Sequence, residues 1–576
     1  MQHEAPVRFL TLATDYDGTL ARDGAVSEAT LAALERFLSS GRRLILVTGR
    51  ELDDLESVFP RLDLFHRVVA ENGALLYRPA SGESQALAEP PSEEFVDLLR
   101  RLGVGPISVG RVIVATWRPH ESAVLEAIRR LGLELQVVFN KDAVMVLPSG
   151  VNKRTGLKAA LKELELSFHN TVGVGDAEND HAFLGACACS VAVDNALPAV
   201  MKTADLVTAA SHGEGVTELI GLMLEDDLVR FEDRLKRHWV PIGRSPDGET
   251  VAARPFRENV LVAGTSGSGK SSLTTLYLER LRAAGFQFCL IDPEGDYGAM
   301  EEMIEIGDAH RAPSEEEVVR ILRNPAQSAG INLVGLPPDD RPSYFAGLMP
   351  HLRQLRARLG HPHAIIVDEA HHLLPGGRDP ALSSYPWGER GLFLITVHPE
   401  HVVREILSGI DLVFALGEDP ETTLRPVADH CGVAAPSWPQ RPLPAGHAVA
   451  WRVRGPGPPL LIKVDPARAE RRRHLRKYAE GELPPERSFF FTGPRGKLHL
   501  RAHNLMLFLQ MGEGVDEETW LHHLRCGDYS AWLRNQIKDV ELAAAVAAIE
   551  RTPGIGAQES RGLIRRAIEE RYTAPA

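Results

Sequence analysis

Two groups of residues in this chain have the types and the spacing that chemistry on phosphate requires. The first group lies in the first half as Asp-x-Asp-Gly-Thr at 15–19, Thr-Gly-Arg at 48–50, Lys153 and Gly-Asp-x-x-x-Asp at 175–180. The second group lies farther along as Gly-x4-Gly-Lys-Ser at 264–271 and an apolar run that ends in Asp368-Glu369. The two groups are chemically unrelated, so the chain is expected to carry two separate sites.

The first group suits attack on a phosphate ester by a carboxylate. Because such an ester resists water, an enzyme gains by dividing hydrolysis into two displacements through a carboxylate nucleophile. Asp15 would attack phosphorus, and Asp17 would protonate the leaving oxygen and later activate water. These carboxylates and the substrate are all anionic, so the site needs Mg²⁺ and the ammonium group of Lys153. The remaining candidates are the carboxylates of Asp176 and Asp180 and the hydroxyl of Thr48.

The second group suits a nucleoside triphosphate. Its glycines follow a strand-like segment and precede a helix-like one, so backbone N–H groups could wrap a phosphate. Lys270 would reach the β- and γ-phosphates, and Ser271 would hold Mg²⁺. Asp368 would hold the same ion through water, and Glu369 would polarise the attacking water. The predicted ATP-binding residues are Gly264, Thr265, Ser266, Gly267, Ser268, Gly269, Lys270, Ser271 and Ser272.

The elements that must position the first group alternate between strand and helix. The expected strands are 7–13, 43–47, 67–70 and 171–175. Such alternation is typical of a parallel, doubly wound sheet, in which ligands bind at the carboxyl ends of the strands. Residues 79–150 interrupt the pattern with two helix-like and several strand-like stretches, which predicts an inserted α+β module.

A second α/β pattern and a helical tail complete the chain. The expected strands of the second pattern are 259–263, 287–291, 363–367, 391–396 and 411–416. The predicted domains are a first domain at 1–225, a linker at 226–250, a P-loop domain at 251–465, a basic linker or helix at 466–486 and a helical module at 487–576.

Composition narrows the class of protein. Apolar residues make up 44% and charged residues 25% of the chain, and no stretch approaches the ~20 consecutive apolar residues of a spanning helix. The N-terminus lacks the basic region and apolar core of a signal peptide, so a cytoplasmic location is predicted. Five cysteines without paired spacing predict reduced thiols. A net charge of −14 argues against a surface that binds nucleic acid nonspecifically.

The first motif group resembles the haloacid dehalogenase (HAD) superfamily, in its Cof-type branch with a cap between the second and third motifs. Flanking sequences that match are Glu71-Asn72-Gly73-Ala74, Val151-Asn152-Lys153 and residues 191–196. The resemblance covers 7–225 and implies a Rossmann-like α/β sheet and a Mg²⁺-dependent phosphatase with an aspartyl-phosphate intermediate. It also implies that residues 79–150 are a cap that closes over the site, so the expected substrate is a small molecule.

The same resemblance implies a role for each matching residue. Asp15 would be the nucleophile, and Asp17 would be the acid and base and also a metal ligand through its backbone. The implied phosphate-binding residues are Thr48, Gly49, Lys153 and Asn179, and the implied Mg²⁺ ligands also include Asp176 and Asp180.

The second motif group resembles the HerA/FtsK branch of hexameric P-loop motors. The matching segments are Leu290–Tyr297, Val367–His371 and the apparent hairpin at 444–448. The resemblance covers about 240–465 and implies a RecA-like ATPase domain that assembles as a ring, such as a hexamer.

Two departures from that branch bear on function. Where the branch usually ends a strand in Thr-Gln, this chain has Thr396-Val397-His398-Pro399, so the sensor of the γ-phosphate is His398 or is missing. The small β-barrel that precedes the core in HerA proteins is replaced by the first domain. Arg390 lies where an arginine could act on a neighbouring subunit, although a structural role is the commoner one. These departures put motor activity in doubt more than nucleotide binding.

The tail resembles a small helical accessory module of multi-domain bacterial enzymes, on the sequence around 520–533.

The leading hypothesis is a bifunctional hydrolase, a HAD phosphatase joined to a HerA-like ATPase, with Mg²⁺ at both sites. Its expected partners are a small phosphorylated metabolite, ATP and further copies of the chain, with no membrane. A second hypothesis is a DNA-processing, defence or repair motor whose phosphatase acts on nucleic-acid or nucleotide phosphate. A third is an ATP-responsive oligomerisation switch that regulates the phosphatase.

Overall fold

The computed structural model describes residues 7–572 except 141, 236–237, 299, 302, 377–387, 439–441, 456, 469–482, 484, 495, 497 and 538. These residues form two compact units. One unit comprises 1–295 and 302–465, and the other comprises 296–301 and 466–576. The basic linker predicted at 466–486 lies for the most part outside the described residues.

The first sheet has eight strands in the order β12-β11-β10-β1-β2-β3-β4-β5. Its strands are β1 (Thr11–Thr14), β2 (Arg43–Val47), β3 (Arg67–Ala70), β4 (Leu75–Arg78), β5 (Glu83–Ala86), β10 (Thr171–Gly175), β11 (Cys189–Ala192) and β12 (Leu206–Val207). The strands from β12 to β3 run parallel, and β4 and β5 turn back antiparallel. The apolar runs at the predicted strands are buried, as a sheet covered on both faces requires.

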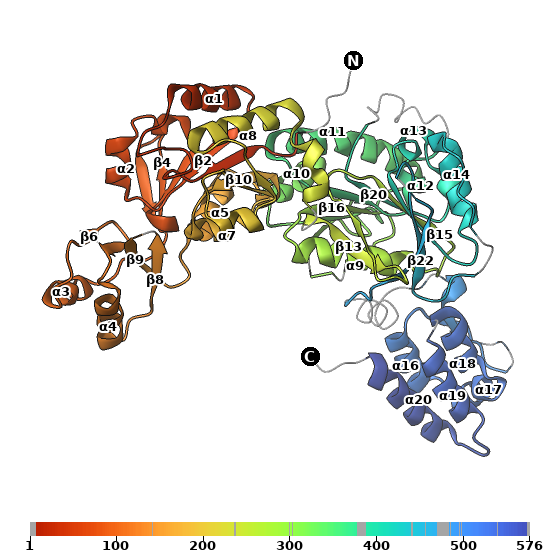
Figure 1. Ribbon diagram of the computed structural model, residues 1–576. Coiled ribbons are helices and arrows are strands. Elements are labelled where there is room, and N and C mark those ends of the chain that lie inside the picture. The colour runs from red at the N-terminus through yellow and green to blue at the C-terminus, as the bar shows by residue number, and fades with distance from the viewer. Residues whose placement is uncertain are drawn as a thin grey trace. The chain divides into compact units, whose positions relative to one another are not determined.

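Helices cover both faces of this sheet (Figure 1). They are α1 (Glu28–Ser39), α2 (Leu52–Val58), α5 (Lys153–Glu163), α6 (His181–Leu184), α7 (Pro198–Thr203) and α8 (His212–Asp226). The α5 helix begins at Lys153 because Asn152 accepts from the Thr155 N–H and Thr155 accepts from the Asn152 N–H. This cap places the lysine in the first turn of a helix at the edge where the strands end.

The cap is a separate α+β module. Its sheet has the order β6-β7-β9-β8, with β6 (Ser108–Val109), β7 (Val114–Trp117), β8 (Leu135–Asn140) and β9 (Ala143–Pro148). Helices α3 (Glu93–Arg101) and α4 (Glu121–Leu131) pack around a small apolar core of their own. The prediction began the cap at 79, but β5 pairs with β4 in the main sheet, so the inserted module begins after Ala86.

The second sheet has eleven strands, in the order β14-β13-β23-β22-β21-β15-β20-β19-β16-β18-β17. The strands are β13 (Val240–Arg244), β14 (Thr250–Ala253), β15 (Val260–Gly264), β16 (Phe288–Asp292), β17 (Ile304–Ile306), β18 (Ala329–Asn332), β19 (Ala364–Val367), β20 (Leu392–Thr396), β21 (Leu412–Leu416), β22 (His447–Arg452) and β23 (Leu460–Val464). Its parallel part runs from β21 to β17, and the other strands pair antiparallel.

One strand falls where a linker was expected. Residues 226–250 were predicted to be a linker, yet β13 pairs with β14 and with β23, and so extends the second sheet. Its partner β14 follows it directly in a hairpin, whereas β23 lies far away in sequence, and the Pro- and Gly-containing segment did not indicate either pairing. The helices that connect the strands of this sheet are α9 (Lys270–Ala283), α10 (Glu315–Leu322), α11 (Arg341–Leu359), α12 (Ala370–Leu373), α13 (Arg404–Leu407) and α14 (Glu421–Cys431).

The second unit is mostly helical, as the sequence pattern predicts (Figure 1). Its elements are the hairpin of β24 (Phe489–Phe491) and β25 (Leu500–Ala502) and helices α16 (Leu505–Gly514), α17 (Glu517–Cys526), α18 (Asp528–Trp532), α19 (Val540–Glu550) and α20 (Ala557–Tyr572). Aromatic side chains fill its core, and His523 packs among them on Phe489. The expected architecture of two α/β parts and a helical tail is therefore confirmed.

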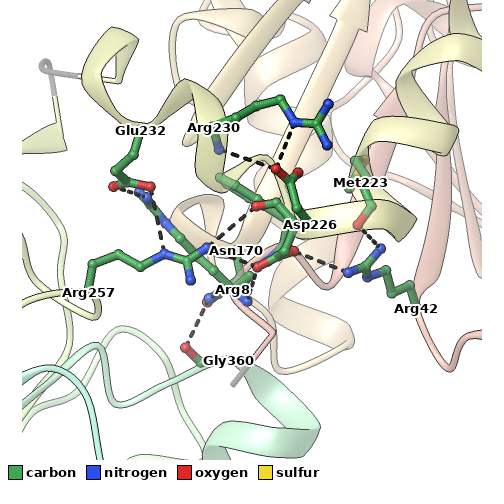
Figure 2. A network of polar contacts seen from close by, with 11 residues as sticks. Arg8, Arg42, Asn170, Met223, Asp226, Arg230, Glu232, Arg257 and Gly360 are labelled. Atoms are coloured by element: carbon green, nitrogen blue, oxygen red, sulfur yellow. Dashed lines mark hydrogen bonds and ion pairs between the residues drawn. The ribbon is translucent and has the colours of Figure 1, made fainter. Parts of the chain in front are cut away.

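The two large sheets are joined at their N-terminal edges by buried polar contacts. Asn170, directly before β10, donates to the carbonyls of Arg8 and Gly360, both at 2.9 Å (Figure 2). Arg257 of the P-loop part reaches Asp227 at 3.2 Å and Glu232 at 3.7 Å. Since both motif groups follow the C-terminal ends of strands, the two sites lie at the edges of their sheets that are opposite this interface.

Two buried histidines in the interface are neutral. The His363 Nδ1 accepts from the Gln287 N–H at 2.9 Å, while its Nε2 lies 3.1 Å from Asn170 Oδ1. The His169 Nε2 lies 2.9 Å from the Ala284 carbonyl oxygen, and its ring stacks on Phe286. Burial lowers the pKa of His169 to about 4 and the pKa of His363 well below its usual value.

Acid should therefore loosen this interface. An unfolded histidine takes up a proton near pH 6.5, whereas folded His169 does so only near pH 4, so its contribution is full above pH 6.5 and is lost as the pH falls toward 4. A shift of this size corresponds to about 3 kcal/mol. We expect the melting temperature to fall between pH 7 and pH 5, and His169→Gln to reduce that fall. An equal fall in His169→Gln and in the exposed control His310→Gln would contradict the assignment.

Candidate functional site

The first site is built around a buried lysine between two carboxylates. Asp15 directly follows β1, and its N–H donates to the Val174 carbonyl of the neighbouring strand β10 at 3.0 Å. The Lys153 Nζ donates to Asp15 Oδ1 and to Asp180 Oδ1, each at 2.6 Å, and the lysine side chain is 1% exposed. Asp15 and Lys153 are 138 residues apart in sequence. The parallel strand ends therefore bring the predicted nucleophile and its cationic partner into direct contact.

Three carboxylates converge at this edge. Oxygen atoms of Asp15, Asp176 and Asp180 lie within 4.8 Å of one another, and all three residues are buried. Asp180 Oδ2 accepts from the N–H groups of Asp176 and Ala177, and the Thr19 hydroxyl donates to Asp176 Oδ1 at 2.9 Å. An all-oxygen set of buried anions suits a hard cation such as Mg²⁺. The donors at this site therefore fit the ion that the sequence implies.

The loop that follows the two carboxylates of the first motif requires glycine. Gly18 has φ +86°, and a Cβ atom there would come within 2.4 Å of Asp176 Oδ2. Only a residue without a side chain lets the loop approach the opposite carboxylate so closely.

The electrostatics of the buried group favour a bound cation. Burial raises the pKa of Asp15 well above its usual value, the neighbouring Asp180 and Asp176 carboxylates add to this, and Lys153 opposes it. Burial also lowers the pKa of Lys153, but the Asp15 and Asp180 carboxylates outweigh burial, so its net pKa is raised. Lys153 is therefore a permanent cation, and a further positive charge would favour the ionised form of Asp15.

Arg50 is a site residue that the sequence analysis did not single out. Its Nε and Nη2 each donate to one oxygen of Asp17 at 2.7 Å, and its Nη1 donates to Asp54 at 2.6 Å. The hydrogen bonds to Asp17 raise the pKa of Arg50. This two-point contact holds the predicted acid in one orientation. Its position directly after Thr48 and Gly49 in the second motif was the signal that could have indicated it.

Glu71 ties the cap to the main sheet. It is fully buried, and its carboxylate accepts from the N–H groups of Arg111, Val112 and Ile113 in the cap at 2.7–3.0 Å. Next to it, Asn72 Oδ1 accepts from the side chain of Asn179, a predicted substrate contact, at 3.2 Å. The Glu-Asn-Gly sequence therefore connects the cap with the loop that carries Asp180.

Thr48 and Gly49 lie at the same edge, directly after β2. Thr48 is fully buried, and its hydroxyl oxygen accepts from the Arg50 N–H at 3.1 Å. All the candidates predicted for the first site thus gather at the C-terminal edge of one sheet.

The second site has the backbone of a phosphate-binding loop. Gly264 ends β15, α9 begins at Lys270, and Gly264, Gly267 and Gly269 have positive φ values of 156°, 79° and 101°. A Cβ atom at Gly264 would lie 2.3 Å from the Leu416 carbonyl oxygen, so the loop needs glycine there. The Lys270 Nζ donates to the carbonyls of Gly264 at 2.8 Å and Thr265 at 3.0 Å. The lysine is folded over the loop that would hold a phosphate.

The acidic pair lies at the same edge. Asp368 and Glu369 directly follow β19, and burial lowers the pKa of Lys270 while the nearby Glu369, Asp368 and Glu294 carboxylates oppose this. Glu369 has φ +42°, which is costly for a residue with a side chain and is found mostly at functional sites. The helix start that holds Ser271 and Ser272 completes the predicted set of residues.

The two candidate sensors lie apart. His398 follows the end of β20 on the side of the P-loop, and its Nδ1 lies 3.1 Å from Glu400. Arg390 precedes β20, at the opposite edge of the sheet, and pairs with Asp411 at 2.6 Å. Arg390 therefore does not reach the P-loop of its own chain, and a role on a neighbouring subunit stays a prediction.

Residues 12–103 and 111–220 match the profile of haloacid dehalogenase-like hydrolases. A phosphoglycolate phosphatase from Haloarcula marismortui is 30% identical over 221 residues, which cover 36% of this chain and 95% of the relative. The chain belongs to the haloacid dehalogenase-like hydrolases. A phosphoglycolate phosphatase from Methanothermobacter thermautotrophicus is 29% identical over 217 residues, 36% of this hydrolase and 96% of the relative.

This haloacid dehalogenase-like hydrolase also resembles solved structures of its family. One from Bacteroides thetaiotaomicron is 18% identical, with a TM-score of 0.34, over 37% of this chain and 99% of that one. Residues 257–388 of the hydrolase match the profile of an AAA domain, so it carries a P-loop domain as well. In the part of the chain that the structure describes, no helix has the length and apolar character to span a membrane.

Proposed function

We propose that this protein is a bifunctional hydrolase. Its first domain hydrolyses a phosphate monoester through an aspartyl-phosphate on Asp15 with Mg²⁺, and its P-loop domain binds and hydrolyses ATP as a HerA-like ATPase. The observation that supports the first activity is the buried contact of Lys153 with Asp15 and Asp180, beside the carboxylate of Asp176. A salt bridge of this kind serves catalysis better than stability, because burying four charged groups is costly.

The mechanism follows from the charges at the first site. An oxygen of Asp15 forms a bond to phosphorus as the bond to the leaving oxygen breaks, and Asp17 gives that oxygen a proton. Asp17 then removes a proton from water, which attacks phosphorus and releases Asp15. Lys153 favours the ionised form of Asp15 and would bind the phosphoryl oxygens. Mg²⁺, held by Asp15, Asp176, Asp180 and the Asp17 carbonyl, would offset the repulsion between carboxylates and phosphate.

Arg50 positions the acid in this scheme. Its two hydrogen bonds fix the Asp17 carboxylate, which is 37% exposed, at the mouth of the site. Thr48, Gly49 and Asn179 complete the proposed contacts with the phosphate and the substrate. Because Glu71 anchors the cap beside Asn179, we propose that a small phosphorylated metabolite is the substrate class.

A panel of phosphate esters tests the first activity. We expect Mg²⁺-dependent release of phosphate from small esters, with 2-phosphoglycolate and sugar phosphates included because relatives are named phosphoglycolate phosphatases. Each ester is assayed with and without Mg²⁺, and with and without ATP. Hydrolysis of none of the esters would contradict the proposal, and hydrolysis only of DNA or nucleotide phosphates would favour the nucleic-acid hypothesis.

At the second site, we propose that the 264–272 loop wraps the phosphates of ATP, Ser271 and Asp368 hold Mg²⁺, and Glu369 polarises water. The glycine conformations and the position of Lys270 support nucleotide binding. We also propose that copies of the chain assemble as a ring, in which Arg390 or another arginine could act on the neighbouring nucleotide.

One observation favours a second role, an ATP-responsive switch on the phosphatase. The two domains share a buried polar interface through Asn170 and Arg257, so a change at one sheet can reach the other only through packed contacts (Figure 2). A phosphatase rate that is the same with and without ATP in the ester panel would exclude this role.

A further inference from the structure

A cluster of histidines and a glutamate lies at the C-terminal edge of the P-loop sheet. His398, Glu400 and His401 belong to the turn that follows β20, and their ligand atoms all lie within 4.8 Å of one another. The His398 Nδ1 lies 3.1 Å from Glu400 Oε1, and the His398 ring stacks on His401 with centroids 4.9 Å apart. All three side chains are exposed, so an ion could reach them from solvent.

A second segment of the chain brings more imidazole to the same place. His371 of α12 lies with its ring centroid 5.5 Å from that of His398, and the His372 ring is 4.1 Å from that of His371. The two segments meet because α12 follows β19, the strand next to β20. The cluster is therefore a feature of the folded sheet edge as well as of one short sequence.

The chemistry of this donor set differs from that of the two sites already described. Two imidazoles and one carboxylate within such a distance match the three protein ligands of a tetrahedral zinc-type site, with water as the fourth ligand. Imidazole nitrogen favours Zn²⁺, Co²⁺ and Ni²⁺, whereas Mg²⁺ prefers oxygen. We propose that His398, Glu400 and His401 bind a divalent transition-metal ion of the Zn²⁺ class. The ion replaces the hydrogen bond between His398 and Glu400.

The site is connected to the predicted catalytic glutamate of the P-loop domain. The His398 N–H donates to the Thr396 hydroxyl at 3.0 Å, and the His371 Nδ1 lies 3.0 Å from the same oxygen. The His371 Nδ1 also lies 3.5 Å from Glu369 Oε2. A metal ion bound by His398 and Glu400 would therefore fix the His398 side chain next to Glu400. The Thr396 hydroxyl would link His398 to His371, which contacts Glu369.

Metal titration of the full chain tests the proposal without ATP. The protein is first saturated with Mg²⁺, and Co²⁺ or Zn²⁺ binding is then followed by calorimetry and by the visible spectrum of Co²⁺. We expect a site with a tetrahedral Co²⁺ spectrum in the unmodified chain. The double variant His398→Ala/His401→Ala should bind at least 10-fold more weakly, since two of three ligands are lost, and Glu400→Gln should also weaken binding.

The controls separate this site from other donors. His310→Ala removes an exposed histidine outside the cluster and should bind as the unmodified chain does. Asp15→Asn alters the acidic site of the first domain and should leave the tetrahedral Co²⁺ spectrum in place. Equal affinity in the double variant and in His310→Ala would overturn the proposal, as would a spectrum of six oxygen ligands alone. If the double variant fails to fold, unchanged binding in Glu400→Gln would overturn it instead.

Discussion

Asp15→Asn should abolish phosphate-ester hydrolysis and leave ATP hydrolysis unchanged. The amide cannot form the bond to phosphorus, so we expect kcat to fall by roughly 10³-fold or more, the scale on which loss of a nucleophile acts. The amide oxygen can still accept a hydrogen bond from Lys153. The substitution also removes a negative charge close to the carboxylates of Asp176 and Asp180. The variant should therefore fold, with a melting temperature close to that of the unmodified protein. Phosphate release from the best ester of the panel is the measurement.

A matched control strengthens the Asp15→Asn experiment. Asp63→Asn makes the same chemical change on an exposed carboxylate that pairs with Arg61, and it should leave both activities within about twofold because surface substitutions have small effects. Retained ester hydrolysis in Asp15→Asn would show that another group attacks phosphorus. Trapping of an acid-stable label by Asp15→Asn but not by the unmodified chain would contradict the aspartyl-phosphate route.

Lys270→Ala should abolish ATP binding and hydrolysis. The ammonium group already lies on the loop carbonyls of Gly264 and Thr265, and it would move to the β- and γ-phosphates when ATP enters. Loss of one preorganised cation of this kind lowers rates by roughly 10²- to 10³-fold. The expected result is no saturable ATP binding by calorimetry and a corresponding loss of ATPase rate.

The phosphatase serves as the internal control for Lys270→Ala. Because the two sites lie at remote edges of their sheets, ester hydrolysis without ATP should stay within about twofold of the unmodified protein, as should both activities of the exposed control Lys463→Ala. Under the switch hypothesis, ATP changes the ester rate of the unmodified chain and has no effect in Lys270→Ala. Unaltered ATP hydrolysis in Lys270→Ala would refute the assignment of the loop.

Much of the fold could be predicted because the signals are local. Apolar runs bounded by motif residues indicated β1, β2, β3, β10 and five strands of the second sheet, since a buried parallel strand reads as a short apolar run. The strand β13 escaped prediction because its Pro and Gly are more typical of a loop, and because one of its partners, β23, lies far away in sequence. The start of the cap was misplaced because β5, whose residues are largely polar, joins the main sheet through a local hairpin with β4.

The candidate sites likewise contain residues that local motifs indicated and residues that only the folded structure shows. The residues of the acidic motifs and the P-loop could be selected because each motif must take one backbone conformation, as Gly18, Gly264 and Gly269 show by their positive φ values. Arg50 and Glu71 stand inside matched motif sequences but were not selected, because their roles lie in contacts with Asp17 and with the cap that only the folded structure shows.

Residue types and local spacing were enough to establish two kinds of phosphate chemistry in one chain, because short motifs encode their own turns. Only the folded sheets show that Lys153 bridges Asp15 and Asp180, and that Arg50 clamps Asp17. The folded sheets also show that the two sites face away from a shared, buried interface at Asn170. The contacts of Lys153 with Asp15 and of Asn170 with Gly360 join residues 138 and 190 positions apart, so they depend on how whole sheets pack rather than on any short stretch of sequence.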